Sequence, residues 1–136
     1  MNPNFHRRKA EKVTRTILRL DPRTDHEMII DGTMIAASQW INYALHRAGI
    51  TPFEFDIMHA YFATGFERQY YALCASPVLI DSLEAIEAIR PQHVRGTAKT
   101  GPAAARKTLS ILAKLKKTAL TLGKTQRPYR TSGQTR

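Results

Sequence analysis

A run of apolar and small side chains at helical spacing extends from residue 25 to residue 48 without a proline. Thr24 or Asp25 can cap its start, and Gly49 follows it at the position that favours a left-handed C′ residue. A segment this long is too long for a typical strand and predicts a helix. The side chains that share its apolar face are Ile29, Ile30, Thr33, Met34, Ala37, Trp40, Ile41, Ala44, Leu45 and Ala48.

Turn signals divide the rest of the chain into further segments with helical spacing. They predict helices over residues 6–20, 52–74, 77–90 and 102–122, with Gly65 as a point where the third of the five helices can split. No segment alternates apolar and polar residues as a strand does. The expected fold is therefore all-α: an up-and-down bundle of about five helices in one domain, residues 1–122, with a disordered basic tail, residues 123–136.

The single cysteine, Cys74, excludes an intrachain disulfide and is expected to be a small core residue. The N-terminal residues resemble no signal peptide, and no apolar run approaches the ~20 residues that a membrane span needs. We therefore expect a cytoplasmic protein without membrane contact.

Charge is distributed unevenly along the chain, whose formal net charge is +10. Residues 95–136 contain 11 Lys and Arg and no acid, and residues 1–23 carry a net +5. Residues 24–94 between them carry a net −6. Such asymmetry favours a polyanionic partner, with RNA before DNA, although a basic tail can also be a solvated appendage.

The basic C-terminal part contains the residues expected to contact nucleic acid. Binding through them would be strongly salt-dependent, because each neutralised phosphate releases roughly one counterion. Tyr129 is the one aromatic residue there that could stack on a base. The candidate contact residues are Arg95, Lys99, Arg106, Lys107, Lys114, Lys117, Arg127 and Arg130.

Enzyme signatures such as a glycine-rich phosphate loop or Cys-x-x-Cys are absent. Arg90-Pro91-Gln92-His93-Val94-Arg95-Gly96 nevertheless places arginine and histidine together in a break between helices. Metal-free RNA cleavage needs a base for the 2′-hydroxyl and a cation for the phosphorane, so Arg90 and His93 are candidate catalytic residues. Alternatively, Arg90 neutralises a helix C-terminus and His93 is a linker residue.

Two further histidines lie near carboxylate or amide side chains. On a helix, Asp56 and His59 would share one face as in carboxylate-bridged metal sites, but such sites repeat the motif and this chain has it once. His46 ends the predicted helix over 25–48 beside Arg47, where the helix dipole alone favours both. We therefore predict no metal site and no cofactor.

The layout resembles the HEPN class of small helical bundles over about residues 24–122. The matching pieces are the segment from Ala36 to His46, then Asp56-Ile57-Met58-His59, then the Arg90–Gly96 break, then the helix over 102–122. The resemblance implies a homodimeric bundle that is either a metal-independent ribonuclease or a non-catalytic partner of a nucleotidyltransferase. Catalytic members separate arginine and histidine by more than the two residues found between Arg90 and His93.

Three functions follow from these patterns. The first is a HEPN-like bundle that binds nucleic acid, RNA before DNA, or a nucleotide-related partner without catalysis. The second is a metal-independent endoribonuclease that uses Arg90 and His93. The third is a structural protein that binds a protein partner, as in a toxin–antitoxin-type pair.

Overall fold

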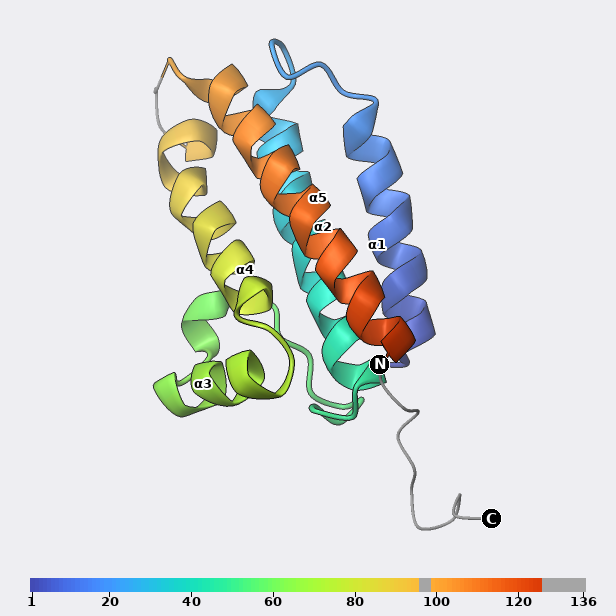
Figure 1. Cartoon of the computed structure of the whole chain (residues 1–136). Coiled ribbons are helices and arrows are strands. Elements are labelled where there is room, and N and C mark those ends of the chain that lie inside the picture. Colours follow the sequence, from blue (N-terminus) through green and yellow to red (C-terminus); the bar gives the residue numbers. More distant parts are fainter. Residues whose placement is uncertain (96–98, 126–136) are drawn as a thin grey trace, which may run out of the picture.

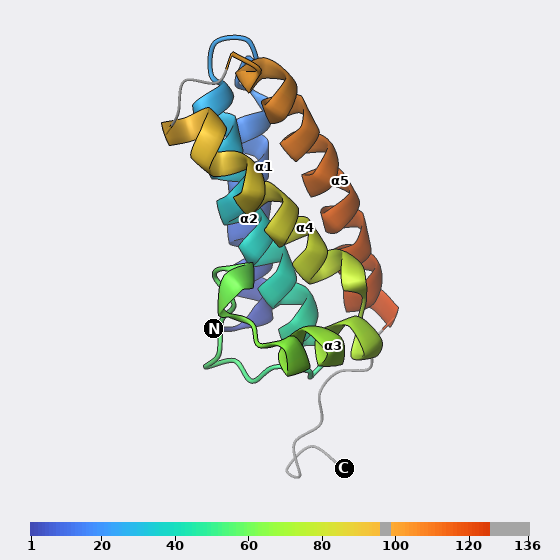
Figure 2. The ribbon, with the colours of Figure 1, turned by 90° about the vertical axis from the view of Figure 1, so that its left-hand side faces the viewer.

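The computed structural model describes residues 1–95 and 99–125, and among these residues it contains helices and no strand. Four long helices run alternately up and down along a common axis, and a shorter one, α3, lies across one end (Figures 1 and 2). The all-α bundle predicted from the sequence is confirmed. The α-helices are α1 (Pro3–Leu18), α2 (His26–Arg47), α3 (Gly65–Cys74), α4 (Pro77–Arg90) and α5 (Gly101–Thr125).

Helix α2 is the centre of the bundle and packs against α1, α4 and α5. From Ala36 to His46 every residue is buried. A helix that is enclosed on all sides needs small or apolar residues around its whole circumference, which this segment supplies. The fully buried Trp40 fills the space beside α1, where its indole N–H donates to the hydroxyl of Thr14 at 3.4 Å.

Both ends of α2 follow the prediction closely. Asp25 is the N-cap residue, although its carboxylate accepts from the backbone of Asp21 instead of capping the helix. At the other end Gly49 has a φ of 75°, the left-handed conformation expected for it. The amide of Ile50 donates to the carbonyl of Leu45 at 2.9 Å, which completes a Schellman ending.

Helices α1 and α2 cross at Gly32, where a Cβ atom would overlap the Cγ2 methyl of Ile17. We expect Gly32→Ala to lower the free energy of unfolding by about 1–2 kcal/mol, because overpacking outweighs the better helix propensity of alanine. Gly65→Ala is the matched control, since no described atom lies within 4 Å of its added Cβ. Urea unfolding measures both variants. The cost of Gly32→Ala should vanish in an Ile17→Ala background, and a cost that persists there would contradict this account.

The helix predicted over residues 52–74 is wrong in its first half. Residues 52–59 contain no helix, a 3₁₀ turn η1 (Ala60–Phe62) follows, and α3 begins only at Gly65. The capping box at this helix start is formed by Thr64 and Glu67. Thr51-Pro52-Phe53-Glu54 also has the sequence of a capping box, but it does not form one, because the Thr51 hydroxyl lies 2.7 Å from Nδ1 of His46 instead.

Asn42 of α2 holds the neighbouring segment in its non-helical conformation. Its Nδ2 donates to the carbonyl of Ile57 at 2.8 Å, and its Oδ1 accepts from the amide of Ile57 at 2.8 Å. A side-chain amide thereby satisfies both backbone groups that a helix would otherwise use. Asp56 and His59 are consequently not on one helix face: His59 contacts Glu87 of α4 at 3.2 Å, and Asp56 faces α1 and α2.

Helices α4 and α5 begin within one residue of their predicted starts at 77 and 102. Ser76 caps α4 through the amide of Val78, and a π-helical turn η2 (Pro91–Arg95) follows α4 directly. Helix α5 continues to Thr125, past the predicted end of the domain at residue 122. The remainder of the predicted tail lies outside the described residues.

Two surface properties complete the fold. Cys74, expected in the core, is exposed at the end of α3, because the helix presents this side to solvent instead of to α4. Within residues 1–95 and 99–125 the structure has no helix of the length and apolar character that a membrane span requires.

Candidate functional site

The two predicted catalytic residues lie near the same end of the bundle but have different partners. The guanidinium of Arg90, at the end of α4, donates to Oδ1 of Asp31 on α2 at 2.8 Å. His93 in η2 lies 3.0 Å from the carbonyl of Ile89 through Nδ1 and 2.7 Å from the hydroxyl of Thr100 through Nε2. Arg90 and His93 are thus each held in place by a different neighbour within the bundle.

Exposed cations are numerous on α1 and α5. Apart from Arg7, they form no ion pair in the described part of the chain, and both helices pack against α2. We call this set the basic surface. It consists of Arg8, Lys9, Lys12 and Arg15 on α1, of Arg19 directly after this helix, and of Arg106, Lys107, Lys114, Lys117 and Lys124 on α5.

Two arginines of the acidic middle of the sequence have ion-pair partners. Arg68 of α3 contacts Asp81 and Glu84 of α4, and Arg90 pairs with Asp31. The ion pairs hold the pKa of Arg68 above and that of Glu84 below the ordinary value. Arg68 and Arg90 are thus paired with acids, as is Arg7 with Glu11 on α1, whereas no residue of the basic surface lies within ion-pair distance of a described acid.

Two aromatic side chains of α2 lie beneath the basic surface. The guanidinium of Arg7 on α1 is 5.8 Å from the ring centre of Tyr43, and the ammonium of Lys116 on α5 is 5.8 Å from that of Trp40. Both rings are buried. They join α1 and α5 to α2, and they cannot stack on a nucleotide base.

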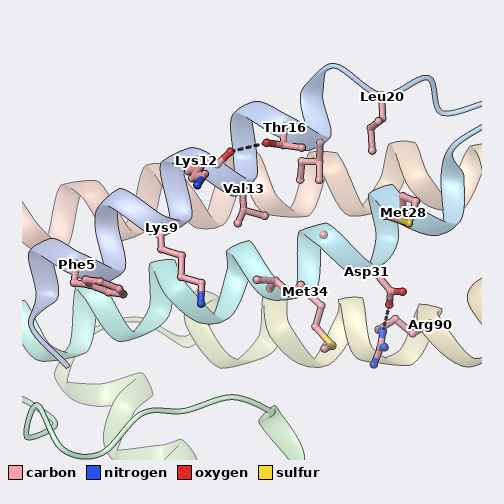
Figure 3. Close-up of a pocket in the computed structure, with 13 residues that line it drawn as sticks. Phe5, Lys9, Lys12, Val13, Thr16, Leu20, Met28, Asp31, Met34 and Arg90 are labelled. Atoms are coloured by element: carbon pink, nitrogen blue, oxygen red, sulfur yellow. Dashed lines mark hydrogen bonds and ion pairs between the residues drawn. The ribbon is translucent and has the colours of Figure 1, made fainter.

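A groove between α1 and α2 adjoins the basic surface, with a cavity volume of about 880 Å³ (Figure 3). Its floor is mostly apolar and includes Val13 and Met34, and Phe5 beside it is 45% exposed. In Figure 3 the Lys9 side chain extends from α1 across the groove towards α2, and the Arg90–Asp31 pair lies at the far side. The groove thus combines an exposed aromatic ring with cations.

Of the residues predicted to contact nucleic acid, Arg106, Lys107, Lys114 and Lys117 are exposed on α5. Lys99 is exposed just before this helix, and the backbone of Arg95 ends η2. Arg127 and Arg130 lie outside the described residues, as does Tyr129. The exposed cations of α1 and the groove beside them were not among the predicted contact residues, because only the tertiary structure places α1 against α2.

The structure also assembles a buried polar cluster that no short motif indicates. Nε2 of His6 on α1 lies 3.0 Å from Oδ1 of Asp56, and Nε2 of His46 on α2 lies 2.8 Å from the same oxygen. The two imidazoles are buried, whereas the Asp56 side chain is 27% exposed. We call these three residues the His–Asp cluster.

The outer nitrogens of both imidazoles have partners of their own. Nδ1 of His6 lies 2.6 Å from Oε1 of Gln39, and Nδ1 of His46 lies 2.7 Å from the hydroxyl and 3.3 Å from the carbonyl of Thr51. These contacts fix the direction of each ring. They turn both Nε2 atoms towards Asp56.

Burial dominates the electrostatics of the His–Asp cluster. Burial lowers the pKa of His46 below its ordinary value, and the contact with Asp56 offsets this only in part. For Asp56 burial acts to raise the pKa, but the contacts with His46 and His6 outweigh it and the pKa is lowered. The expected state near neutral pH is an ionised Asp56 beside a neutral His46.

A smaller cavity of about 340 Å³ lies on the other side of Asp56. Its lining includes His59, Glu67 and Tyr71 among apolar residues. Burial, together with the Glu67 carboxylate, raises the pKa of Tyr71 to about 12, so this phenol stays protonated at neutral pH. Asp56 therefore lines this cavity and also contacts the buried imidazole pair.

Comparison with known proteins adds no relative: neither a family model, nor a curated protein, nor a solved structure matches this chain. The resemblance to the HEPN class remains a prediction from the sequence.

Proposed function

We propose that this protein binds single-stranded nucleic acid, RNA before DNA, through the basic surface on α1 and α5 and without catalysis. The observation that carries the proposal is the number of exposed cations on and next to α1 and α5 that have no ion-pair partner among the described residues. Among the described residues, the ten cations of the basic surface form no ion pair, whereas Arg68 and Arg90 in the acidic middle of the sequence do. Unneutralised like charges repel one another and attract a polyanion.

The dimensions of the basic surface suit an extended ligand better than a small anion. Helix α5 has 25 residues and is therefore about 37 Å long. Lys107, Lys114 and Lys117 are spread along it, each exposed and separated by one or two helical turns. Such spacing allows a phosphate backbone to run along the helix with several contacts in sequence.

The groove favours a single strand over a duplex. Unpaired bases can stack on exposed rings, and Phe5 is half-exposed beside Lys9 and Lys12. Stacking of a base on a ring and ion pairing of lysine with phosphate are both possible for any base, so we expect little sequence preference. The proposal does not extend to cleavage, because Arg90 and His93 each have other partners.

A binding titration at several salt concentrations tests the proposal. We expect the full chain to bind an unstructured RNA oligonucleotide with a slope of log K against log salt of about −4 or steeper. Cleavage is followed on the same samples with chelator present, and intact RNA is expected. Absence of binding at low salt would refute the proposal, and a protein partner that survives nuclease and high salt would favour the protein-binding alternative.

A further inference from the structure

We propose that His6, His46 and Asp56 form a binding site for a divalent transition-metal ion of the zinc type. The inference is independent of nucleic-acid binding, since it concerns the end of the bundle where α1 begins and α2 ends (Figure 1). Its starting point is the convergence of three donor atoms, which all lie within 4.8 Å of one another.

The position of the proton on each imidazole decides which of its nitrogens can bind a metal ion. Oε1 of Gln39 and the carbonyl of Thr51 can each accept from Nδ1 of the neighbouring imidazole, and the metal-binding form of the site is the tautomer in which both Nδ1 atoms donate. A neutral imidazole that carries its proton on Nδ1 has a lone pair on Nε2. Two such lone pairs then face one carboxylate oxygen of Asp56 at 2.8 and 3.0 Å, an arrangement that repels unless a cation lies between them.

A metal ion bound between the two rings would supply this positive charge. His6 and His46 are both buried, and removing a charged imidazole from water is costly. Their rings lie 5.2 Å apart, so two imidazolium charges would also repel each other. The Met1 amino group, 3.8 Å from Asp56 Oδ1, is the other cation near the carboxylate.

The distances are close to those needed for coordination to a small ion. Zinc binds imidazole nitrogen at about 2.0–2.1 Å and carboxylate oxygen at about 2.0–2.2 Å. Two ligands of a tetrahedral ion at these distances are about 3.4 Å apart, so metal binding would widen the 2.8 and 3.0 Å separations between each Nε2 and Asp56 Oδ1 by about half an ångström.

The composition of the site selects the class of ion. Two imidazoles and one carboxylate suit zinc and related first-row ions, whereas calcium and magnesium need mainly oxygen ligands. Gln39 and Thr51 occupy the place of the outer hydrogen-bond acceptors that orient metal-binding histidines. Three protein ligands leave a coordination position open, and the partly exposed Asp56 also lines the 340 Å³ cavity.

Calorimetric titration of the chelator-treated full chain with Zn²⁺ alone tests the proposal. We expect one zinc per chain with a Kd in the micromolar range or tighter, and a zinc-dependent rise in the unfolding temperature. Co²⁺ should bind in its place and give a visible absorption band that reports nitrogen and oxygen ligands. A folded wild-type chain that binds neither ion would overturn the proposal and leave a metal-free cluster, in which Gln39 and the Thr51 hydroxyl donate to the imidazoles.

Variants identify the ligands. Asp56→Asn and His46→Gln should each weaken zinc binding at least 100-fold, and Gln39→Leu about 10–100-fold, the loss typical of an orienting partner. His93→Gln is the matched control, since His93 lies near the opposite end of the bundle, and it should bind zinc as the wild type does. Circular dichroism shows whether each variant is folded. Unchanged affinity in folded Asp56→Asn and Gln39→Leu would overturn the assignment, whatever the behaviour of His46→Gln.

Discussion

Replacing Asn42 with alanine is expected to lower the free energy of unfolding by about 3–5 kcal/mol. The side chain is fully buried and makes 2.8 Å hydrogen bonds with both the amide and the carbonyl of Ile57. Alanine would leave two buried backbone groups without partners, at about 1–3 kcal/mol each, and a small cavity besides. Urea unfolding followed by circular dichroism measures this change in the free energy of unfolding.

Ser38→Ala is the matched control for Asn42→Ala. Ser38 is buried one turn earlier on α2, and its hydroxyl donates to the carbonyl of Ile35 at 3.0 Å. That carbonyl is already part of the helix, so we expect a loss of no more than about 1 kcal/mol. Equal losses in the two variants would mean that Asn42 does not hold the segment from Pro52 to His59. Faster chymotrypsin cleavage of this segment in Asn42→Ala alone would support the clamp.

Neutralising four cations of the basic surface is expected to weaken RNA binding about 100-fold at 0.1 M salt. The variant is Arg8→Gln, Arg15→Gln, Lys114→Gln and Lys117→Gln, all at exposed positions on α1 and α5. Each lost phosphate contact should also make the salt slope shallower by about 0.7 for a single strand. The measurement is the same titration at several salt concentrations, and the fold should be unaffected because these side chains are exposed.

A second variant tests whether RNA affinity depends on the position of the charges or only on the net charge. Gln69, Leu73, Ala88 and Gln92 are exposed on α3, α4 and η2, and changing all four to glutamate alters the net charge by the same amount. We expect this control to lose less than about 5-fold in affinity, because screening reduces interactions beyond about 10 Å. Equal losses would mean that only the total charge attracts RNA. A further pair, Arg127→Gln and Arg130→Gln, measures the contribution of the C-terminal residues.

Helices with a continuous apolar pattern were predictable because the apolar spacing and the capping residues indicate the same helix boundaries. The segment from residue 25 to residue 48 is one such case, and its ending at Gly49 follows from the left-handed conformation that glycine adopts at low cost. The start of α4 at Ser76-Pro77 is another, since a cap followed by proline defines a helix beginning locally. Element type and order therefore followed from the sequence.

The segment after Thr51 had equally good local signals and does not form the predicted helix. Threonine and proline there match a helix start, but the Thr51 hydroxyl contacts His46. The Asn42 side chain forms hydrogen bonds with both the amide and the carbonyl of Ile57. Both partners belong to α2 and approach only when the chain folds back. A side chain from another element can outweigh local propensity, since propensity differences are typically below about 1 kcal/mol per residue.

Patterns within the sequence were sufficient to predict the helical class, most helix boundaries and the separation of basic ends from an acidic middle. Each of these depends on residues that are close together in the chain, through periodicity, capping and charge content. The tertiary structure decided that α1 and α5 lie against the same central helix and that Asp56 meets His6 and His46. These contacts join residues 50 and 10 positions apart, and no local pattern specifies which distant polar groups will share one buried site.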